Sequence, residues 1–149
     1  MNEAAEFDYL PEMNESINGA EWTVDEDWQS PFLTTGQRVV LRKGFATDGA
    51  SIPQAFWTVI GHPMQAPLLG PALCHDALYA GELVPDHSTA DWMFLEWMQM
   101  AGIGWVKRNL VYSAVRTWGW TVWNKHTPAS IAASRNMCAL IDAVKDAAK

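Results

Sequence analysis

The stretch His75-Asp76-Ala77-Leu78-Tyr79 is expected to organise the rest of the fold. A short helix is predicted here, starting near Pro71, because proline suits the first helical position, and ending at Gly81. In a helix Tyr79 lies four residues after His75 and three after Asp76, so the three side chains crowd around one point. A histidine, a carboxylate and a phenol at one point can move a proton, hold a metal ion, or do both.

The next helix is predicted from about Ser88 to Met100. Ser88 suits the N-cap position, and Asp91 then falls at the third helical position, as in a capping box. A capping carboxylate can still face a cleft, so Asp91 has two compatible interpretations, as a cap and as a site residue. Two more helices are expected, one from about residue 105 to 118 and one from Thr127-Pro128 to about Ala147.

The segment before the central helix combines strands with an irregular loop. Strands are predicted at residues 21–24 and 37–42, and a short helix at 54–60. The loop GFATDGASIP, residues 44–53, places small residues around Asp48, which either caps its own turn or points toward a ligand. The predicted class is therefore α+β, mostly helical: a short N-terminal antiparallel hairpin followed by about five packed helices, with residues 1–20 as an acidic flexible arm and 21–149 as a single globular domain.

The distribution of charge excludes several classes of protein. The net charge is −7, and nine of the seventeen acidic residues lie in residues 1–27, which hold no lysine or arginine. A basic surface for nucleic acid is therefore not expected.

No apolar run approaches the roughly 20 residues of a membrane span, and the N-terminus lacks the features of a signal peptide. The chain is expected to be made in the cytoplasm without a transmembrane segment. Cys74 and Cys138 form no CxxC pair, which argues against a zinc ribbon.

The middle of the chain is acidic without compensating bases. Residues 44–106 hold six Asp or Glu and no Lys or Arg. Carboxylates that folding draws together repel one another unless a cation compensates. Either these groups stay apart in solvent or a metal ion joins them, and Asp76 and Asp48 are the expected metal ligands.

Four blocks stand in order along the chain: GFATDGASIP (44–53), ALCHDALY (72–79), ADWMFLEWM (90–98) and VYSAVRTWGW (111–120). Together they resemble a family of small phage and prophage proteins, grouped as a domain of unknown function, with the pattern GFxTDxASIP, HDxLY, ADxxFLxxM and YxAVRxxG. The match covers residues 38–123. It implies a phage or prophage origin, with synthesis in the host cytoplasm and association with the virion as an option, and it supplies no reaction.

HDxxY followed by ADxxF also resembles the active-site helices of calcium-dependent phospholipases of the A-two type. That resemblance implies His75 as the general base, Asp76 as a calcium ligand, Asp91 as the carboxylate that orients the histidine, and Tyr79 as its support. An imidazole fixed by a carboxylate is a competent base near neutral pH, and calcium would polarise the ester carbonyl. The glycine-rich calcium loop and the disulfides of those enzymes are absent, so Asp48 and main-chain carbonyls would have to replace the loop.

Three functions follow from these patterns. The first is a metal-dependent hydrolase of an ester or amide, with lipid as the most concrete substrate. The second keeps the residues and replaces calcium with zinc, as in peptidases that cleave cell-wall peptidoglycan. The third is no enzyme: a virion or tail-assembly component, or a phage protein that binds a host protein, with the acidic arm and a tryptophan-rich surface as contacts. In that case His75, Asp76, Tyr79 and Asp91 form a buried hydrogen-bond network that fixes helix packing.

Overall fold

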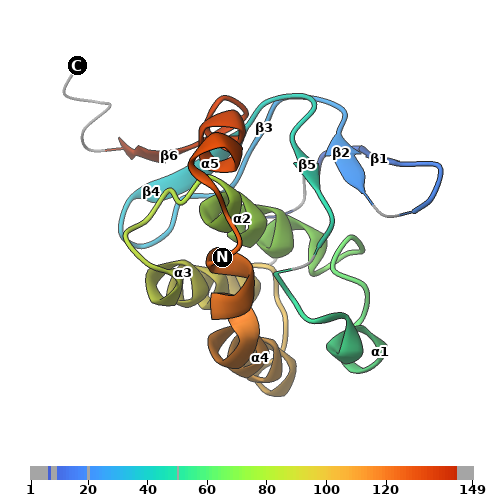
Figure 1. Ribbon diagram of the computed structural model, residues 1–149. Coiled ribbons are helices and arrows are strands. Elements are labelled where there is room, and N and C mark those ends of the chain that lie inside the picture. The colour runs from blue at the N-terminus through green and yellow to red at the C-terminus, as the bar shows by residue number, and fades with distance from the viewer. Residues whose placement is uncertain (1–6, 8–9, 20, 50, 144–149) are drawn as a thin grey trace.

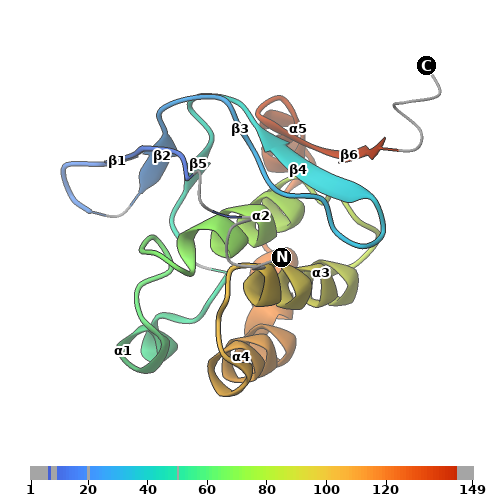
Figure 2. The ribbon, with the colours of Figure 1, turned by 180° about the vertical axis from the view of Figure 1, so that it is seen from behind.

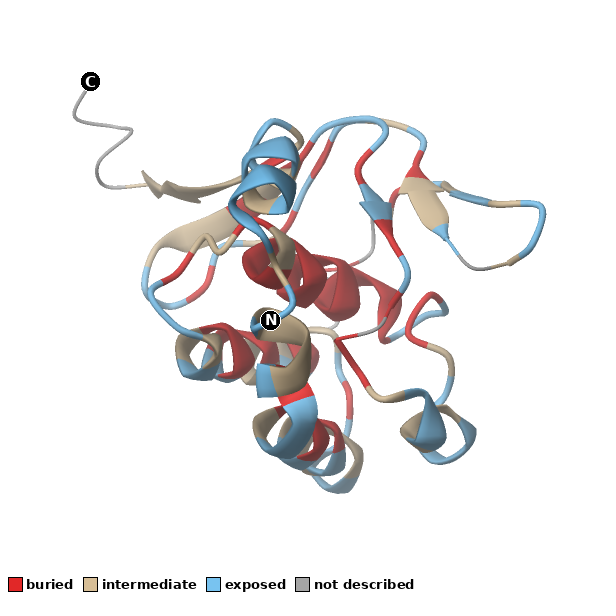
Figure 3. Ribbon diagram, viewed as in Figure 1, coloured by how far each residue is buried: buried red, intermediate tan, exposed pale blue. Residues whose placement is uncertain are grey.

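The computed structural model describes residues 7, 10–19, 21–49 and 51–143. The helix α2 (Leu69–Ala80) lies at its centre, between the strands on one side and the helices α3 (His87–Met100) and α4 (Trp105–Trp123) on the other (Figure 1; Figure 2). Every residue of α2 from Leu69 to Tyr79 is buried (Figure 3). A helix that is buried around its whole circumference belongs at the centre of a protein, and this one forms the middle of the core.

The start of α2 differs from the sequence prediction. The helix begins at Leu69, so Pro71 is its third residue and not its first. Proline is tolerated there because the first N–H groups of a helix have no intrahelical carbonyl to bond. The predicted end is confirmed, since the backbone N–H of Gly81 closes the last turn onto the carbonyl of Ala77.

The strands form two small antiparallel sheets. The first contains β1 (Met13–Glu15), β2 (Trp22–Val24) and β5 (Ala46–Thr47), in that order. The second contains β3 (Trp28–Gln29), β4 (Gln37–Leu41) and β6 (Cys138–Asp142). The two predicted strands thus lie in different sheets, and the α+β class is confirmed.

The predicted acidic arm is described only in part. Residues 1–6, 8, 9 and 20 lie outside the described part of the chain. Within the rest of the arm, β1 pairs with β2, and Phe7 is buried against Trp28 with 6.4 Å between the ring centroids.

The prediction of a last helix running to about Ala147 is wrong. The helix α5 (Pro128–Arg135) ends at Asn136, and the chain then enters β6, where Cys138 pairs with Leu41 and Asp142 with Gln37. β6 completes the hydrogen bonds on one edge of β4, and those backbone bonds outweigh the helical periodicity of the segment.

The remaining elements are short. A 3₁₀ turn at Gln54–Phe56 leads into α1 (Trp57–Ile60). In the part of the chain that the structure describes, no helix is both long enough and apolar enough to cross a membrane.

Candidate active site

α2 carries three polar side chains into the protein interior. The exposed fraction of the residue is 0% for His75, 7% for Asp76 and 1% for Tyr79. The imidazole of His75 lies between two aromatic rings, with centroids 4.3 Å from the ring of Tyr79 and 4.4 Å from that of Phe94. Polar groups buried this deeply need hydrogen-bond partners, and each has them.

Asp91 on α3 receives the first set of these bonds. Its Oδ1 lies 2.7 Å from Nε2 of His75 and accepts a hydrogen bond of 2.6 Å from the hydroxyl of Tyr79. Its Oδ2 accepts a bond of 3.3 Å from Arg116 Nη1 on α4 and lies 3.4 Å from Nδ1 of His87. The structure therefore brings together the three residues predicted as catalytic.

The capping interpretation of Asp91 is wrong. Asp86 is the N-cap of α3, because its carboxylate accepts a hydrogen bond of 2.8 Å from the backbone N–H of Thr89. The helix consequently begins at His87, two residues earlier than a Ser88 cap requires. Asp91 is left free to turn inward, where it is 0% exposed.

The environment of Asp91 favours its ionised form. Burial raises the pKa of the carboxyl, but the hydrogen bond and charge of His75 and the bonds from Tyr79 and His87 outweigh burial, so the pKa lies below its usual range. An ionised Asp91 can hold an imidazolium, and it accepts a bond from Nε2–H of a neutral imidazole.

Asp76 faces the opposite side, toward the irregular loop that follows β5. Ser51 donates a hydrogen bond to its Oδ1 and Thr47 donates one to its Oδ2. Burial raises the pKa of Asp76 and so does the charge of Asp48, while the bonds from Ser51 and Thr47 and the charge of His75 lower it; the net shift is upward.

Ser51 connects the two carboxylates through His75. Its Oγ lies 3.1 Å from Nδ1 of His75 and also bonds Asp76. A continuous chain of hydrogen bonds therefore runs from Asp76 through Ser51 and His75 to Asp91.

Sequence reasoning missed Ser51, Thr47, His87 and Arg116 as members of the network. The only signal for the first two was their place on either side of Asp48 in the block GFATDGASIP, and Arg116 lies in the block VYSAVRTWGW.

A cavity of about 440 Å³ lies beside this network. Thr47, Ser51, Asp76 and Tyr79 are part of its wall, whereas His75 and Asp91 lie behind it. Asp48 also lines the cavity and is exposed, and its charge raises the pKa of Asp76. No Lys or Arg is among the described residues that line the cavity. Its acidic and imidazole side chains are those of Glu21, Asp48, Asp76 and His126.

The described side chains do not fit the calcium or zinc site that the sequence predicts. Both ring nitrogens of His75 already face partners, and both oxygens of Asp76 accept bonds from hydroxyl groups. Among the described residues, no group of three or more His, Cys, Asp or Glu side chains is placed to hold a metal ion. Zinc usually takes three or four such ligands and calcium six to eight oxygens.

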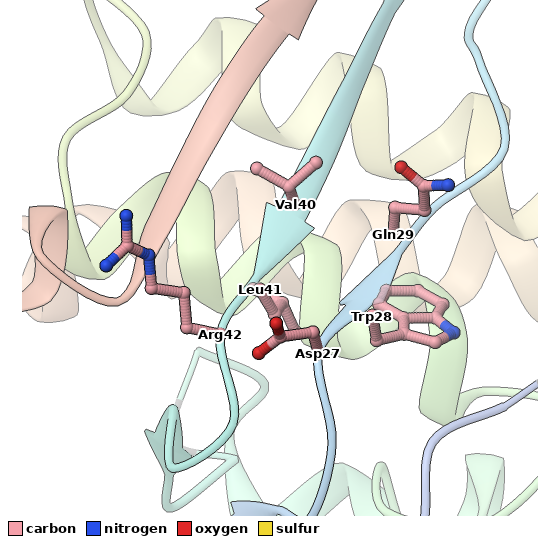
Figure 4. Close-up of a pocket in the computed structure, with 6 residues that line it drawn as sticks. All are labelled: Asp27, Trp28, Gln29, Val40, Leu41 and Arg42. Carbon is pink, nitrogen blue, oxygen red and sulfur yellow. The ribbon is translucent and has the colours of Figure 1, made fainter.

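A second cavity, of about 420 Å³, lies over β3 and β4 (Figure 4). Its ionisable side chains are Asp27 and Arg42, and none of the residues of the His75 network lines it. The described residues of its wall carry no imidazole and no hydroxyl group, so this cavity lacks the hydroxyl–imidazole pair that Ser51 and His75 form beside the other cavity. The cavity beside Ser51 is the candidate active site.

Comparison with known proteins places most of the chain in one family. Residues 22–115 match the family described as "Protein of unknown function (DUF1353)". The chain is also 35% identical over 111 residues to the uncharacterized protein y4jT of Sinorhizobium fredii, an alignment covering 72% of this chain and 27% of that protein. The chain thus spans about a quarter of the length of that relative. No solved structure matches the chain.

Proposed function

The chain belongs to the DUF1353 family, and we propose that it is a hydrolase of an ester or amide in which His75 is the general base. One observation supports this proposal above the others. A buried carboxylate holds Nε2 of His75 at 2.7 Å, while Nδ1 faces the hydroxyl of Ser51 in the wall of a 440 Å³ cavity.

Each neighbour of His75 has a defined part in this chemistry. Asp91 holds the proton of the imidazole on Nε2, which leaves the lone pair of Nδ1 directed toward the cavity wall. When Nδ1 takes up a proton, the ionised Asp91 stabilises the resulting imidazolium. Tyr79 fixes the position of Asp91, and Arg116 provides positive charge on its outer oxygen.

The location of His75 suits a base that works out of contact with bulk water. At 0% exposure it can reach a substrate only through the groups in the cavity wall in front of it. Electrostatic interactions are stronger in such a place than in water, so the fixed pair with Asp91 has a large effect on proton transfer.

The charge of the cavity bears on the substrate. Glu21, Asp48 and Asp76 line it, and no described lining residue is Lys or Arg. An anionic phospholipid headgroup would be repelled there unless a cation accompanied it, whereas a peptide with a free amine would be attracted. Of the two substrate classes, a cell-wall peptide amide therefore fits this cavity better than a phospholipid ester.

The test is hydrolysis by the purified full-length chain. Peptidoglycan fragments and phosphatidylglycerol vesicles would be supplied separately, with release of new amines or of fatty acid as the readouts. His75→Gln should abolish activity on whichever substrate is cleaved, while the matched control His62→Gln, outside the network, should retain it. Failure of the wild-type chain to cleave either substrate would count against the proposal.

Metal dependence is tested in the same assay. Since the described side chains do not assemble a metal site, dialysis against EDTA should leave the rate unchanged. A rate lost in EDTA and restored by calcium alone would favour the metal-dependent reaction that the sequence resemblance implies.

A second candidate function rests on exposed aromatic side chains. The exposed fractions are 65% for Trp92 on α3 and 68%, 50% and 52% for Trp105, Trp118 and Trp120 on α4. Such side chains suit contacts with another protein, as in a virion component or a host-binding phage protein. In that case the network only fixes packing, and His75→Gln would lower stability with no hydrolysis to lose.

A further inference from the structure

We propose that Ser51 is the nucleophile of this hydrolase, so that the reaction passes through a covalent acyl-enzyme. This inference rests on the proposed function, since it assigns the atom that attacks the substrate. It concerns a residue that motif reasoning from the sequence did not select.

The geometry of Ser51 is that of a hydroxyl next to a base. Its Oγ lies 3.1 Å from Nδ1 of His75, and Nε2 of the same ring lies 2.7 Å from Asp91. The three residues come from the loop after β5, from α2 and from α3, and they stand in the order hydroxyl, imidazole, carboxylate. In serine hydrolases the hydroxyl usually contacts Nε2 and the carboxylate Nδ1; here the two nitrogens exchange places, which preserves the relay.

The position of Ser51 also argues against a directly activated water. Ser51 is 4% exposed, yet it is part of the cavity wall, so its Oγ lies between the base and the open space. Nε2 is already occupied by Asp91 and Nδ1 by Ser51. A water molecule could give a proton to His75 only after displacing Ser51 from Nδ1, whereas Ser51 already contacts that nitrogen.

The protons of the relay can be arranged in two ways without changing their number. In one, Ser51 donates to an ionised Asp76, and His75, protonated on both nitrogens, donates through Nδ1 to Ser51 Oγ. In the other, Asp76 is protonated and donates to Ser51, which donates to Nδ1 of a neutral His75. The bonds that Ser51 and Thr47 donate to Asp76 are those of the first arrangement. Burial of Asp76 favours its neutral form, and transfer of one proton along the relay from His75 to Asp76 gives the second arrangement, in which Ser51 is prepared for attack.

The reaction balances within these groups. Ser51 Oγ forms a bond to the carbonyl carbon of the substrate while its proton passes to Nδ1 of His75. The bond from that carbon to the leaving oxygen or nitrogen then breaks, and the leaving group takes the proton from His75. Water attacks the resulting ester of Ser51, gives its proton to His75, and releases the acid with return of the proton to Ser51.

Labelling of the full-length chain with a fluorophosphonate tests the nucleophile directly. Intact mass should rise by one adduct, and peptide mapping should place the adduct on Ser51. His75→Gln should slow labelling at least a hundredfold, and Ser51→Ala should abolish it. The matched control Ser113→Ala, on the outward face of α4, should label at the wild-type rate.

A second variant covers the case in which Ser51→Ala does not fold. Ser51→Cys keeps a nucleophile of similar size, and its thiol should react with iodoacetamide faster than the buried Cys74 and Cys138, at a rate that His75→Gln lowers.

The outcomes separate this inference from the proposed function. Hydrolysis that depends on His75 without any adduct on Ser51 would overturn the nucleophile and leave the hydrolase standing. An adduct on a different serine would also overturn it. A chain that neither hydrolyses substrate nor takes the label would overturn both.

Discussion

Gly119 of α4 lies directly against the hydroxyl of Tyr79, and replacing it with alanine should damage the network from outside. A Cβ at this position would overlap Tyr79 Oη and stand 3.2 Å from its Cζ. The tyrosine ring cannot easily move away, because it packs 4.3 Å from the imidazole of His75 and 5.2 Å from Trp123 between ring centroids. Gly119→Ala should therefore overpack the contact between α4 and the tyrosine ring and also break the bond from Tyr79 to Asp91.

The magnitude follows from three contributions. Alanine in a helix gains about 1 kcal/mol over glycine. Overpacking costs about 1–3 kcal/mol, and losing a buried hydrogen bond to a charged group costs about 1.5–3 kcal/mol. The sum predicts that Gly119→Ala destabilises the fold by about 3 kcal/mol, although alanine is the better helix former. In a Tyr79→Phe background the Oη contact and its bond are already gone, so the same substitution should change stability by less than about 1 kcal/mol.

Urea unfolding of the four proteins of this cycle measures the effect, with the slope m held constant as a check on two-state behaviour. If Gly119→Ala stabilises the wild-type chain, or costs as much with phenylalanine at position 79 as with tyrosine, then Tyr79 does not lie against α4 as described.

Three further predictions concern ionisable groups. Because the pKa of Asp91 is lowered on folding, its ionised form stabilises the protein above the ordinary carboxyl range, and that stabilisation is lost as pH falls through the lowered pKa. Asp91→Asn should therefore lower the free energy of unfolding by about 3 kcal/mol at pH 7. Urea titrations at acid pH should show a smaller loss. The pKa of Asp76 is raised on folding, so the stability that its neutral form contributes is present at low pH and lost as pH rises through the raised value. The free energy of unfolding of Asp76→Asn should therefore increase relative to that of wild type over this rise. A difference between the two proteins that does not change with pH would contradict the prediction. Burial raises the pKa of Cys138 to about 11 and that of Cys74 further, so Ellman's reagent at pH 8 should modify both thiols only after denaturation, and rapid reaction of either in the native protein would refute their burial.

Much of the candidate site could be predicted from helix geometry alone. His75 and Tyr79 lie four residues apart in a segment with helical periodicity, so their contact needs no tertiary information. The expectation that Asp76 joins them at one point is wrong, because Asp76 faces Thr47 and Ser51. Asp91 could be singled out as an acid on the following helix. Its 2.7 Å distance to His75 depends on how α3 packs against α2, which the sequence does not state.

The misses have physical causes of the same kind. Asp86 and Ser88 are both favourable N-cap residues. Which of them caps α3 depends on the conformation of the loop between α2 and α3, which sets the residue at which the helix begins. The segment after Arg135 has helical spacing, yet the open edge of β4 recruits it as a strand. The metal ligation expected of Asp76 and Asp48 stays a prediction; the hydroxyl groups of Thr47 and Ser51 bond Asp76, and Arg116 reaches Asp91 from α4.

The sequence by itself determined the α+β class, the buried central helix and the side chains that this helix offers, because local periodicity and residue type set which face is apolar and which groups need partners. Only the tertiary structure decided that Ser51 stands between Asp76 and His75 while Asp91 lies behind the ring. That order arises from the packing of three segments separated in the chain, and hydrogen bonds between such segments leave no periodic trace in the sequence.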